Sequence, residues 1–228
     1  MSGLEDISIS NCSFTNNSTT RGAFYPSYCN NITVDNCLFD NNQTAAFDAY
    51  GAAIFIWQNT NFTISNSNFT NNLAGNAGAI YHDGREIGAD ATNLVLDNCT
   101  FSGNNAQDWG GGAIYAFSAS MTITDCAFAQ NAATNSGGHV FFGGVDKDVI
   151  VMNSSFEGGM AQFGGAHNCY GENGNHTMVG NTYTANIATT SGGAVINGFK
   201  ANVSYEDCLF EDNEAQFGGV MYCQNDTT

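Results

Sequence analysis

Short runs of alternating apolar and polar residues recur along the chain, and polar corners separate them. Leu94 and Leu96 lie on one side of such a run by the two-residue period of a β-strand. After a corner at residues 97–98, Cys99 and Phe101 form a second run, and a third run follows a polar turn and begins with Gly-Ala. The pattern contains no helical period of 3.6 residues, so each unit predicts three short strands and no helix.

The unit repeats along the whole chain. An aromatic residue is followed three positions later by Asn, and some ten positions further on by Gly-Ala or a close variant. Successive aromatic residues are separated by between 25 residues (Phe14 to Phe39) and 32 residues (Phe69 to Phe101). A period in this range is typical of a solenoid.

Short strands in successive units, with no helix between them, predict an all-β, right-handed, three-faced parallel β-helix of about eight coils. Because the repeat makes one continuous stack, we treat residues 1–228 as a single solenoid. The pattern is in phase at both ends, which leads us to expect a segment of a longer repeat protein.

Stacked coils place equivalent residues above one another, so the motif predicts two interior ladders. The repeated aromatic residues are expected to stack as rings: Phe14, Phe39, Phe69, Phe101, Phe128, Phe156, Tyr183 and Phe210. The repeated asparagines are expected to form an amide ladder at a tight corner: Asn17, Asn42, Asn72, Asn104, Asn131, Asn186 and Asn213. The motif residues therefore have structural roles and are not active-site candidates.

The charge of the chain limits its partners. The formal net charge is −17, with four Lys and Arg residues in all. This balance argues against nucleic acid, anionic membranes and polyanionic substrates, which require basic contacts. No apolar run approaches the ~20 residues of a membrane span, so membrane insertion is not expected. We expect no cofactor, apart from weak calcium binding at acidic residues such as Glu211 and Asp212.

The closest copies of the motif resemble a known family of repeats. Residues 101–104 (Phe-Ser-Gly-Asn) are followed by Gly-Gly-Ala-Ile at 111–114, and residues 183–186 (Tyr-Thr-Ala-Asn) by Gly-Gly-Ala-Val at 192–195. This combination resembles the polymorphic outer membrane protein repeat of chlamydial autotransporter adhesins. The resemblance implies a right-handed β-helix exposed at a cell surface and used for adhesion or display. The translocator barrel of that family has no counterpart in this sequence, and similar repeats occur in surface proteins of other microbes.

Glycosylation sequons (Asn-x-Ser/Thr) are abundant. Four of them precede a predicted strand in an outer turn, where a glycan could extend into solvent: Asn31, Asn61, Asn175 and Asn202. Asn42 also lies in a sequon, but its place in the amide ladder should turn it inward. These sites, together with the resemblance, lead us to expect an extracellular or cell-surface location.

Several cysteines share one position, two residues before the aromatic residue. Cys12 and Cys37 lie in adjacent coils, as do Cys99 and Cys126, and a rung spacing of ~4.8 Å suits a disulfide. Buried thiols are the alternative, because serine occupies the same position in other coils.

An enzyme is the alternative class, since β-helices also include polysaccharide lyases and glycoside hydrolases. Asp146 and Asp148 are the best carboxylate pair, but a solvated turn explains them. His139 replaces an inward alanine, whereas His167 comes one residue later and is expected to face the other way, so the two should not converge. Where the sixth coil has Gly159 in place of Asn, we expect a local kink.

We therefore predict a non-catalytic extracellular β-helix that serves as a structural spacer, fibre component or adhesion module. Its expected partners are other copies or segments of the same surface assembly, or cell-surface glycans or proteins. The longest turn insertion, residues 82–90, is a further place where a partner could be recognised, although a loop without a role explains it equally well.

Overall fold

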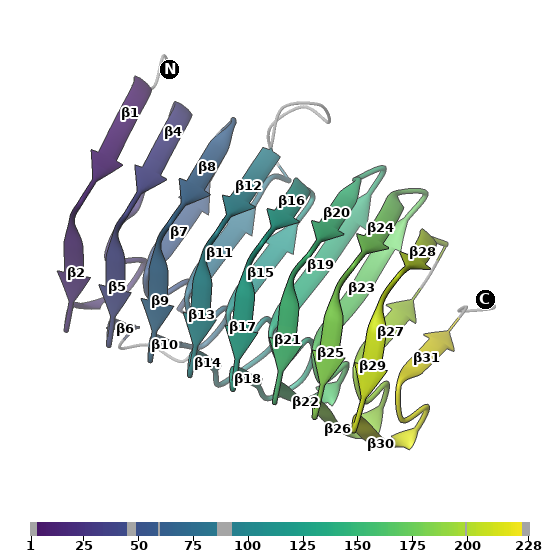
Figure 1. Cartoon of the computed structure of the whole chain (residues 1–228). Helices are drawn as coiled ribbons and strands as arrows, with labels where there is room; N and C mark the ends of the chain where they lie inside the picture. Colours follow the sequence, from purple (N-terminus) through teal and green to yellow (C-terminus); the bar gives the residue numbers. More distant parts are fainter. Residues whose placement is uncertain (1–3, 45–48, 59, 86–92, 199, 225–228) are drawn as a thin grey trace.

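A computed structural model describes residues 4–44, 49–58, 60–85, 93–198 and 200–224. The chain winds into successive coils along one axis, with the N-terminus at one end of the stack and the C-terminus at the other (Figure 1). Every strand pair is parallel and joins neighbouring coils, as β12 and β16 do. The predicted all-β parallel solenoid of about eight turns is confirmed. Among the described residues, no helix has the length and hydropathy needed to cross a membrane.

The strands form four sheets. The first sheet contains β1 (Glu5–Ser10), β4 (Asn30–Asp35), β8 (Phe62–Ser65), β12 (Asn93–Asp97), β16 (Ser120–Thr124), β20 (Val149–Met152), β24 (Asn175–Val179) and β28 (Asn202–Glu206). The second contains β2 (Ser13–Thr15), β5 (Leu38–Asp40), β9 (Asn68–Thr70), β13 (Thr100–Ser102), β17 (Ala127–Ala129), β21 (Ser155–Glu157), β25 (Thr182–Thr184) and β29 (Leu209–Glu211).

The third sheet contains β3 (Ser18–Thr19), β6 (Gln43–Thr44), β10 (Leu73–Ala74), β14 (Asn105–Ala106), β18 (Ala132–Ala133), β22 (Met160–Phe163), β26 (Ile187–Ser191) and β30 (Glu214–Phe217). The fourth contains β7 (Ile54–Trp57), β11 (Ile80–Asp83), β15 (Ile114–Phe117), β19 (Val140–Val145), β23 (His167–Glu172), β27 (Val195–Gly198) and β31 (Met221–Gln224).

The third sheet is an addition to the three strands that the sequence predicted for each coil. Its strands lie in the segment that we assigned to a polar turn, and most of them are two residues long, such as β10 and β14. Small buried side chains of three of these strands pack against one another, namely Ala106, Ala133 and Ala161. A two-residue strand is too short to show an alternating pattern, which is why the sequence did not reveal it.

The predicted aromatic ladder is confirmed. Consecutive rings of the eight residues are stacked with centroids 4.6–5.0 Å apart and interplanar angles of 3–8°. In the middle coils these side chains are fully buried; Phe101, for example, has no exposed surface. The stack fills the interior of the coil because each ring occupies the same position of its rung.

The predicted amide ladder is also confirmed. The Asn72 Nδ2 donates to the Asn104 Oδ1 at 2.9 Å and to the Phe39 carbonyl at 2.9 Å, and the Asn72 backbone N–H donates to the same Oδ1 at 3.1 Å. Asn42 repeats these contacts with Asn72 and has no exposed surface, so its sequon is turned inward. Each amide thus satisfies backbone groups that the corner leaves free.

The two glycines of the Gly-Gly-Ala motif have different roles. Gly111 has φ of 68°, a left-handed conformation that favours glycine. Gly112 lacks such a φ, but a Cβ placed on it would collide with the Gly138 carbonyl of the next coil and would come within 2.6 Å of the Ala132 carbonyl. The first glycine therefore permits the turn, and the second permits close approach of neighbouring backbones.

His139 repairs the amide ladder where Gly159 interrupts it. The Asn131 Nδ2 lies 2.9 Å from the His139 Nδ1, and the His139 Nε2 lies 3.2 Å from the Asn186 Oδ1. Because the Asn131 amide donates, the Nδ1 accepts and the ring proton is on the Nε2. Burial lowers the pKa of His139 to about 3, so the ring is neutral. A Cβ on Gly159 would lie 2.6 Å from this ring, so the glycine makes room for the histidine.

The expectation that His139 and His167 do not converge is wrong. Both are fully buried, and both rings lie 6.0 Å from the Phe156 ring. The alternation of the strand does not continue through the Gly-Ala corner, so the residue after the alanine position also points inward. The ladder stays continuous in the sixth coil, where the local irregularity is a register shift between β22 and β26.

Side chains at the shared cysteine position form hydrogen bonds with backbone groups at a corner. The Cys99 N–H donates to the Cys126 Sγ at 3.4 Å, and the Cys126 N–H donates to the Ser154 Oγ at 3.1 Å. The Cys99 thiol donates to the Asp97 carbonyl at 3.3 Å. All eight cysteines are free thiols in the structure. A disulfide between Cys12 and Cys37, or between Cys99 and Cys126, stays a prediction.

Candidate functional site

The outer side of the fourth sheet is rich in aromatic side chains, and we call it the aromatic face. The second and fourth residues of each strand point outward, and the parallel register aligns them in two columns. The second-position column is Phe55, Tyr81, Tyr115, Phe141, Asn168, Ile196 and Tyr222. The fourth-position column is Trp57, Asp83, Phe117, Gly143, Tyr170, Gly198 and Gln224.

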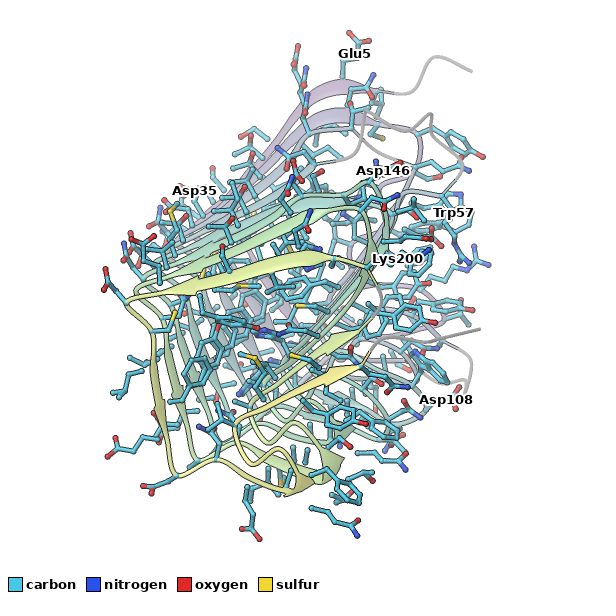
Figure 2. The ribbon with its side chains drawn as sticks, turned by 90° about the vertical axis from the view of Figure 1, so that its right-hand side faces the viewer. Glu5, Asp35, Trp57, Asp108, Asp146 and Lys200 are labelled. Atoms are coloured by element: carbon cyan, nitrogen blue, oxygen red, sulfur yellow. The ribbon has the colours of Figure 1, made fainter. Side chains whose placement is uncertain are left out.

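Aromatic rings in the second-position column stack on one another. The Tyr81 and Tyr115 centroids are 5.0 Å apart at 3°, and the Tyr115 and Phe141 centroids are 4.6 Å apart at 6°. Desolvation raises the pKa of Tyr115 to about 12, so its phenol remains a hydrogen-bond donor at neutral pH. Figure 2 looks along the stack and shows Trp57 and Asp108 on this side of the rod and Asp35 on the opposite side.

An ion pair between Asp83 and Arg85 lies on the aromatic face. Asp83 is almost fully buried, and Arg85 binds it in a bidentate manner, with the Nε 3.0 Å from the Oδ1 and the Nη2 2.5 Å from the Oδ2. The Arg85 guanidinium also lies 5.3 Å from the centroid of the Phe117 ring. The predicted insertion at residues 82–90 thus begins with an anchored segment, and its residues 86–90 lie outside the described part of the chain.

The aromatic face is hollowed where the ring stack ends. After Phe141 the column continues with Asn168 and Ile196, whose side chains are smaller than an aromatic ring. A hollow of about 410 Å³ opens there, within the usual range of ligand pockets. Trp109 and Tyr170, exposed by 48% and 45%, are among its lining residues. The described residues that line it are Trp109, Tyr115, Phe117, Asn135, Ser136, Phe141, Phe163, Asn168, Tyr170, Ile196, Gly198 and Gln224.

Asn168 supplies a buried polar group to this hollow. The residue is 7% exposed, and its Oδ1 is buried without a hydrogen-bond partner. Other buried polar atoms without a partner, such as the Tyr183 hydroxyl and the His82 ring nitrogens, belong to residues that do not line the hollow. None of the described residues that line the hollow carries a charge. The hollow therefore combines aromatic walls with a few neutral polar groups.

The four predicted glycosylation sites are all exposed at an outer corner. The Asn61 Nδ2 donates to the Asn31 Oδ1 at 3.1 Å, and the Asn202 Nδ2 donates to the Asn175 Oδ1 at 3.4 Å. The atoms that would carry a glycan are thus accessible, and they take part in a surface ladder. Modification of these residues stays a prediction.

The acidic candidates do not gather into one site. Asp146 and Asp148 are exposed, and the Asp148 Oδ1 accepts hydrogen bonds from the Asn175 N–H at 3.0 Å and the Asn175 Nδ2 at 3.2 Å. Glu211 and Asp212 are exposed at the end of β29. Within the described ranges, no three His, Cys, Asp or Glu side chains are grouped so that they could hold a metal ion.

Sequence reasoning missed the aromatic face, although a signal for it was present. After the inward alanine, an apolar residue and then an aromatic residue follow in four coils, at Tyr25, Phe55, Tyr81 and Tyr115, and Phe141 takes the same place in the coil that has His139 instead of alanine. These aromatic residues do not recur in every coil, unlike the residues of the interior ladders. Asn168 is visible in sequence only as a polar residue within an apolar run.

Successive parallel coils of one chain, with two ladders in their interior, define a β-solenoid of the β-helix class. The chain belongs to the family described as "Right handed beta helix region", which it matches over residues 52–228. This confirms the predicted hand, which is also visible in the winding of the ribbon (Figure 1). The more specific relation to polymorphic outer membrane protein repeats stays a prediction.

Two curated proteins are similar to the chain. Metabotropic glutamate receptor-like protein R of Dictyostelium discoideum is 31% identical over 159 residues, which cover 68% of this chain and 9% of that protein. The probable autotransporter YfaL of Escherichia coli (strain K12) is 30% identical over 179 residues, which cover 78% of this chain and 13% of that protein. The chain thus spans about a tenth of the length of these relatives. No solved structure matches it significantly.

Proposed function

We propose that the protein is a non-catalytic, extracellular or cell-surface β-helix that holds the aromatic face on a rigid rod for adhesion. The single observation that carries this proposal is the open, uncharged, aromatic-lined hollow on the outside of a solenoid whose interior is filled by ladders. Exposed aromatic surface of this kind is typical of an interaction site. A probable autotransporter and a receptor-like protein among the relatives support a surface location.

The residues around the hollow support binding without catalysis. Hydrolysis or elimination on a sugar requires carboxylates or another acid–base pair near the reacting bond. Among the residues that the structure describes, those that line the hollow include neither a carboxylate nor a histidine, and Asp146 and Asp148 do not belong to them. This role requires no cofactor, and weak calcium binding at the acidic surface residues stays a prediction. We also propose that the repeats are of the polymorphic outer membrane protein type, as their motif suggests.

A bead assay tests the adhesion role. Beads that carry the chain are applied to the cells that produce it, to a eukaryotic epithelial line and to a Gram-negative bacterium. The double variant Trp109→Ala and Tyr170→Ala is expected to reduce adherence to the level of bare beads. The matched control is Ile150→Thr, which changes an exposed apolar residue of the first sheet and should adhere as the parent does. Equal adherence of both variants, or no adherence to any cell, overturns the adhesion role.

Surface location has its own test. An antibody against the chain should stain intact, unpermeabilised producing cells, with an internal protein as the negative control. Staining that appears only after permeabilisation contradicts the proposed location. Intact mass before and after deglycosylation of the natural protein then shows whether Asn31, Asn61, Asn175 and Asn202 carry glycans.

A further inference from the structure

We propose that the first coil adds a docking site for a protein partner to the aromatic face. An Asp or Glu side chain of the partner pairs there with the Arg21 guanidinium, and an apolar side chain next to it packs on Tyr25. The site is separate from the hollow, whose described lining includes neither residue. The inference rests on the proposed adhesion role and adds to it the chemical class of the partner.

The first coil extends the fourth sheet by one short segment beside β7. Isolated parallel bridges connect Phe24 and Ser27 to β7, so Tyr25, which lies between them, is opposite Phe55 in the second-position column. The Tyr25 and Phe55 ring centroids are 4.9 Å apart, and Tyr25 is 41% exposed. At this end of the sheet the column therefore presents an aromatic ring to solvent.

Arg21 lies across these two rings. Its guanidinium carbon is 5.6 Å from the Phe55 centroid and 6.0 Å from the Tyr25 centroid, where a ring attracts a cation. The Nη1 also donates to the Tyr25 hydroxyl at 3.4 Å, and the Arg21 backbone N–H donates to the Thr19 Oγ1 at 3.1 Å. The side chain is exposed but already held in place, which reduces the entropy that a new contact would cost.

Arg85 shows what Arg21 lacks. Both guanidinium groups lie over aromatic rings of the fourth sheet, that of Arg85 over Phe117, and Arg85 also binds the Asp83 carboxylate through two nitrogens. Among the residues that the structure describes, no Asp or Glu lies within ion-pair distance of Arg21. Arg21 therefore presents the same planar fork of N–H donors without the carboxylate that completes it at Arg85.

The charge of the chain limits which anion can reach Arg21. The sequence has 21 Asp and Glu residues and four Lys and Arg residues. This charge repels polyanions such as nucleic acids and heavily sulfated glycans, which carry many charges close together. A single carboxylate on an otherwise neutral or basic surface meets less repulsion and matches the fork of one guanidinium.

The neighbours of Arg21 favour a protein surface over a free organic acid. Arginine and tyrosine are enriched among the residues that contribute most to binding at protein interfaces. An apolar side chain of the partner can cover the exposed Tyr25 ring and exclude water from the ion pair, which strengthens the pair. A partner with an apolar residue next to its carboxylate thus uses both parts of the site.

NMR of the guanidinium groups tests the site without any substitution. The chain has two arginines, so the Nε–Hε region contains two signals, and the ion-paired Arg85 is an internal control. The probes are N-acetyl-Phe-Glu-amide, the neutral N-acetyl-Phe-Gln-amide and inorganic phosphate. We expect the glutamate probe to shift the Arg21 signal saturably without moving that of Arg85, and the glutamine probe to bind about fivefold more weakly.

A measurement without any probe can overturn the inference. If the Arg21 Hε exchanges with water as slowly as the Arg85 Hε, a group of the chain already occupies the Arg21 guanidinium. A stronger response of the Arg21 signal to phosphate than to the glutamate probe overturns the assignment to a protein carboxylate.

Substitutions in the bead assay test whether the site contributes to adhesion. Arg21→Gln should reduce adherence at least about threefold, and Arg21→Lys should reduce it less, because lysine keeps the charge but not the planar fork. The matched control is Lys200→Gln, which removes the same charge from another exposed residue and should adhere as the parent does. All three variants should unfold at the temperature of the parent, since both positions are exposed.

The outcomes separate this inference from the adhesion role. If the Trp109→Ala and Tyr170→Ala variant loses adherence while Arg21→Gln adheres as the parent does and the glutamate probe leaves the Arg21 signal unmoved, the carboxylate site is overturned and the adhesion role stands. If the Arg21 signal responds but the beads adhere to no cell, the adhesion role fails and the carboxylate site stands. Equal losses in Arg21→Gln and Lys200→Gln indicate an effect of net charge alone and overturn the site.

Discussion

The histidine that replaces an asparagine in the amide ladder permits a stringent test of the fold. We predict that His139→Ala and Gly159→Asn each destabilise the solenoid, and that the double variant is less destabilised than the sum of the two. The double variant recreates the arrangement of the other coils, which have a small residue after the glycine and an asparagine in the ladder. The prediction depends on the ring of His139 occupying the space of the missing asparagine side chain.

The magnitudes follow from the contacts. His139→Ala removes both ring hydrogen bonds, leaves a buried Asn131 N–H without this partner and creates a cavity, for a total of about 3–5 kcal/mol. Gly159→Asn places a Cβ 2.6 Å from the imidazole and close to the Gly165 carbonyl, which costs about 3 kcal/mol or more. In the double variant the imidazole is absent, so a coupling energy of roughly 2–3 kcal/mol should be recovered. The Gly165 carbonyl must still shift, so recovery is incomplete.

Urea unfolding of the parent, both single variants and the double variant gives the four free energies of unfolding that a double-mutant cycle requires. Because solenoids can unfold in stages, hydrogen exchange at the Asn131 and Asn186 backbone amides should be followed alongside the global signal. Strict additivity would refute the reasoning, since it would mean that the two residues do not share one space. A single Gly159→Asn variant as stable as the parent would refute it equally.

Three further predictions concern pH, the glycines and the thiols. Burial lowers the pKa of His139 and His167 to about 3 from an ordinary 6.5. The stability that each neutral ring contributes is therefore complete above pH 6.5 and is lost as the pH falls toward 3, by up to ~1.4 kcal/mol per pH unit and group. His139→Ala should reduce this dependence of the unfolding free energy on pH, and an unchanged dependence contradicts the neutral, buried state of His139. Gly112→Ala should destabilise by several kcal/mol because its Cβ meets the Gly138 carbonyl, whereas Gly158→Asn, at a left-handed position with open space, should change stability by less than about 1 kcal/mol; thermal unfolding that ranks them in the reverse order refutes this. A thiol reagent in denaturant should titrate all eight cysteines if the free-thiol arrangement holds, whereas four titratable thiols would establish the two disulfides.

Much of the interior could be predicted from the sequence, because a stacked coil repeats one chemical environment at one position. Phe101 and Asn104 occur in the same phase as their counterparts in almost every coil, so their stacking follows from the period alone. The third sheet could not be predicted in this way. Strands such as β10 contain two residues, and their formation depends on pairing with the neighbouring coil rather than on any local pattern.

The histidine repair could not be predicted either. Sequence shows Gly159 and His139 as two separate departures from the repeat, 20 residues apart, and only the closed coil brings the imidazole into the vacant amide position. For the same reason, the inward orientation of His167 was missed. The two-residue alternation applies within a strand, whereas the Gly-Ala corner places two successive residues inside the coil.

The sixth coil departs from the repeat at two positions, Gly159 inside the coil and Asn168 on the aromatic face, and the two departures have opposite consequences. This difference is the strongest argument for where function lies. Inside the coil, the loss of the asparagine at Gly159 is compensated, because His139 contacts an amide on each side. On the aromatic face, the second-position column has Asn168 between Phe141 and Ile196, and the Asn168 Oδ1 is buried without a hydrogen-bond partner. A position that serves only the fold is stabilised when another residue of the chain supplies the missing contact, and His139 does so for Gly159. The Asn168 Oδ1, in contrast, has no hydrogen-bond partner among the residues that the structure describes.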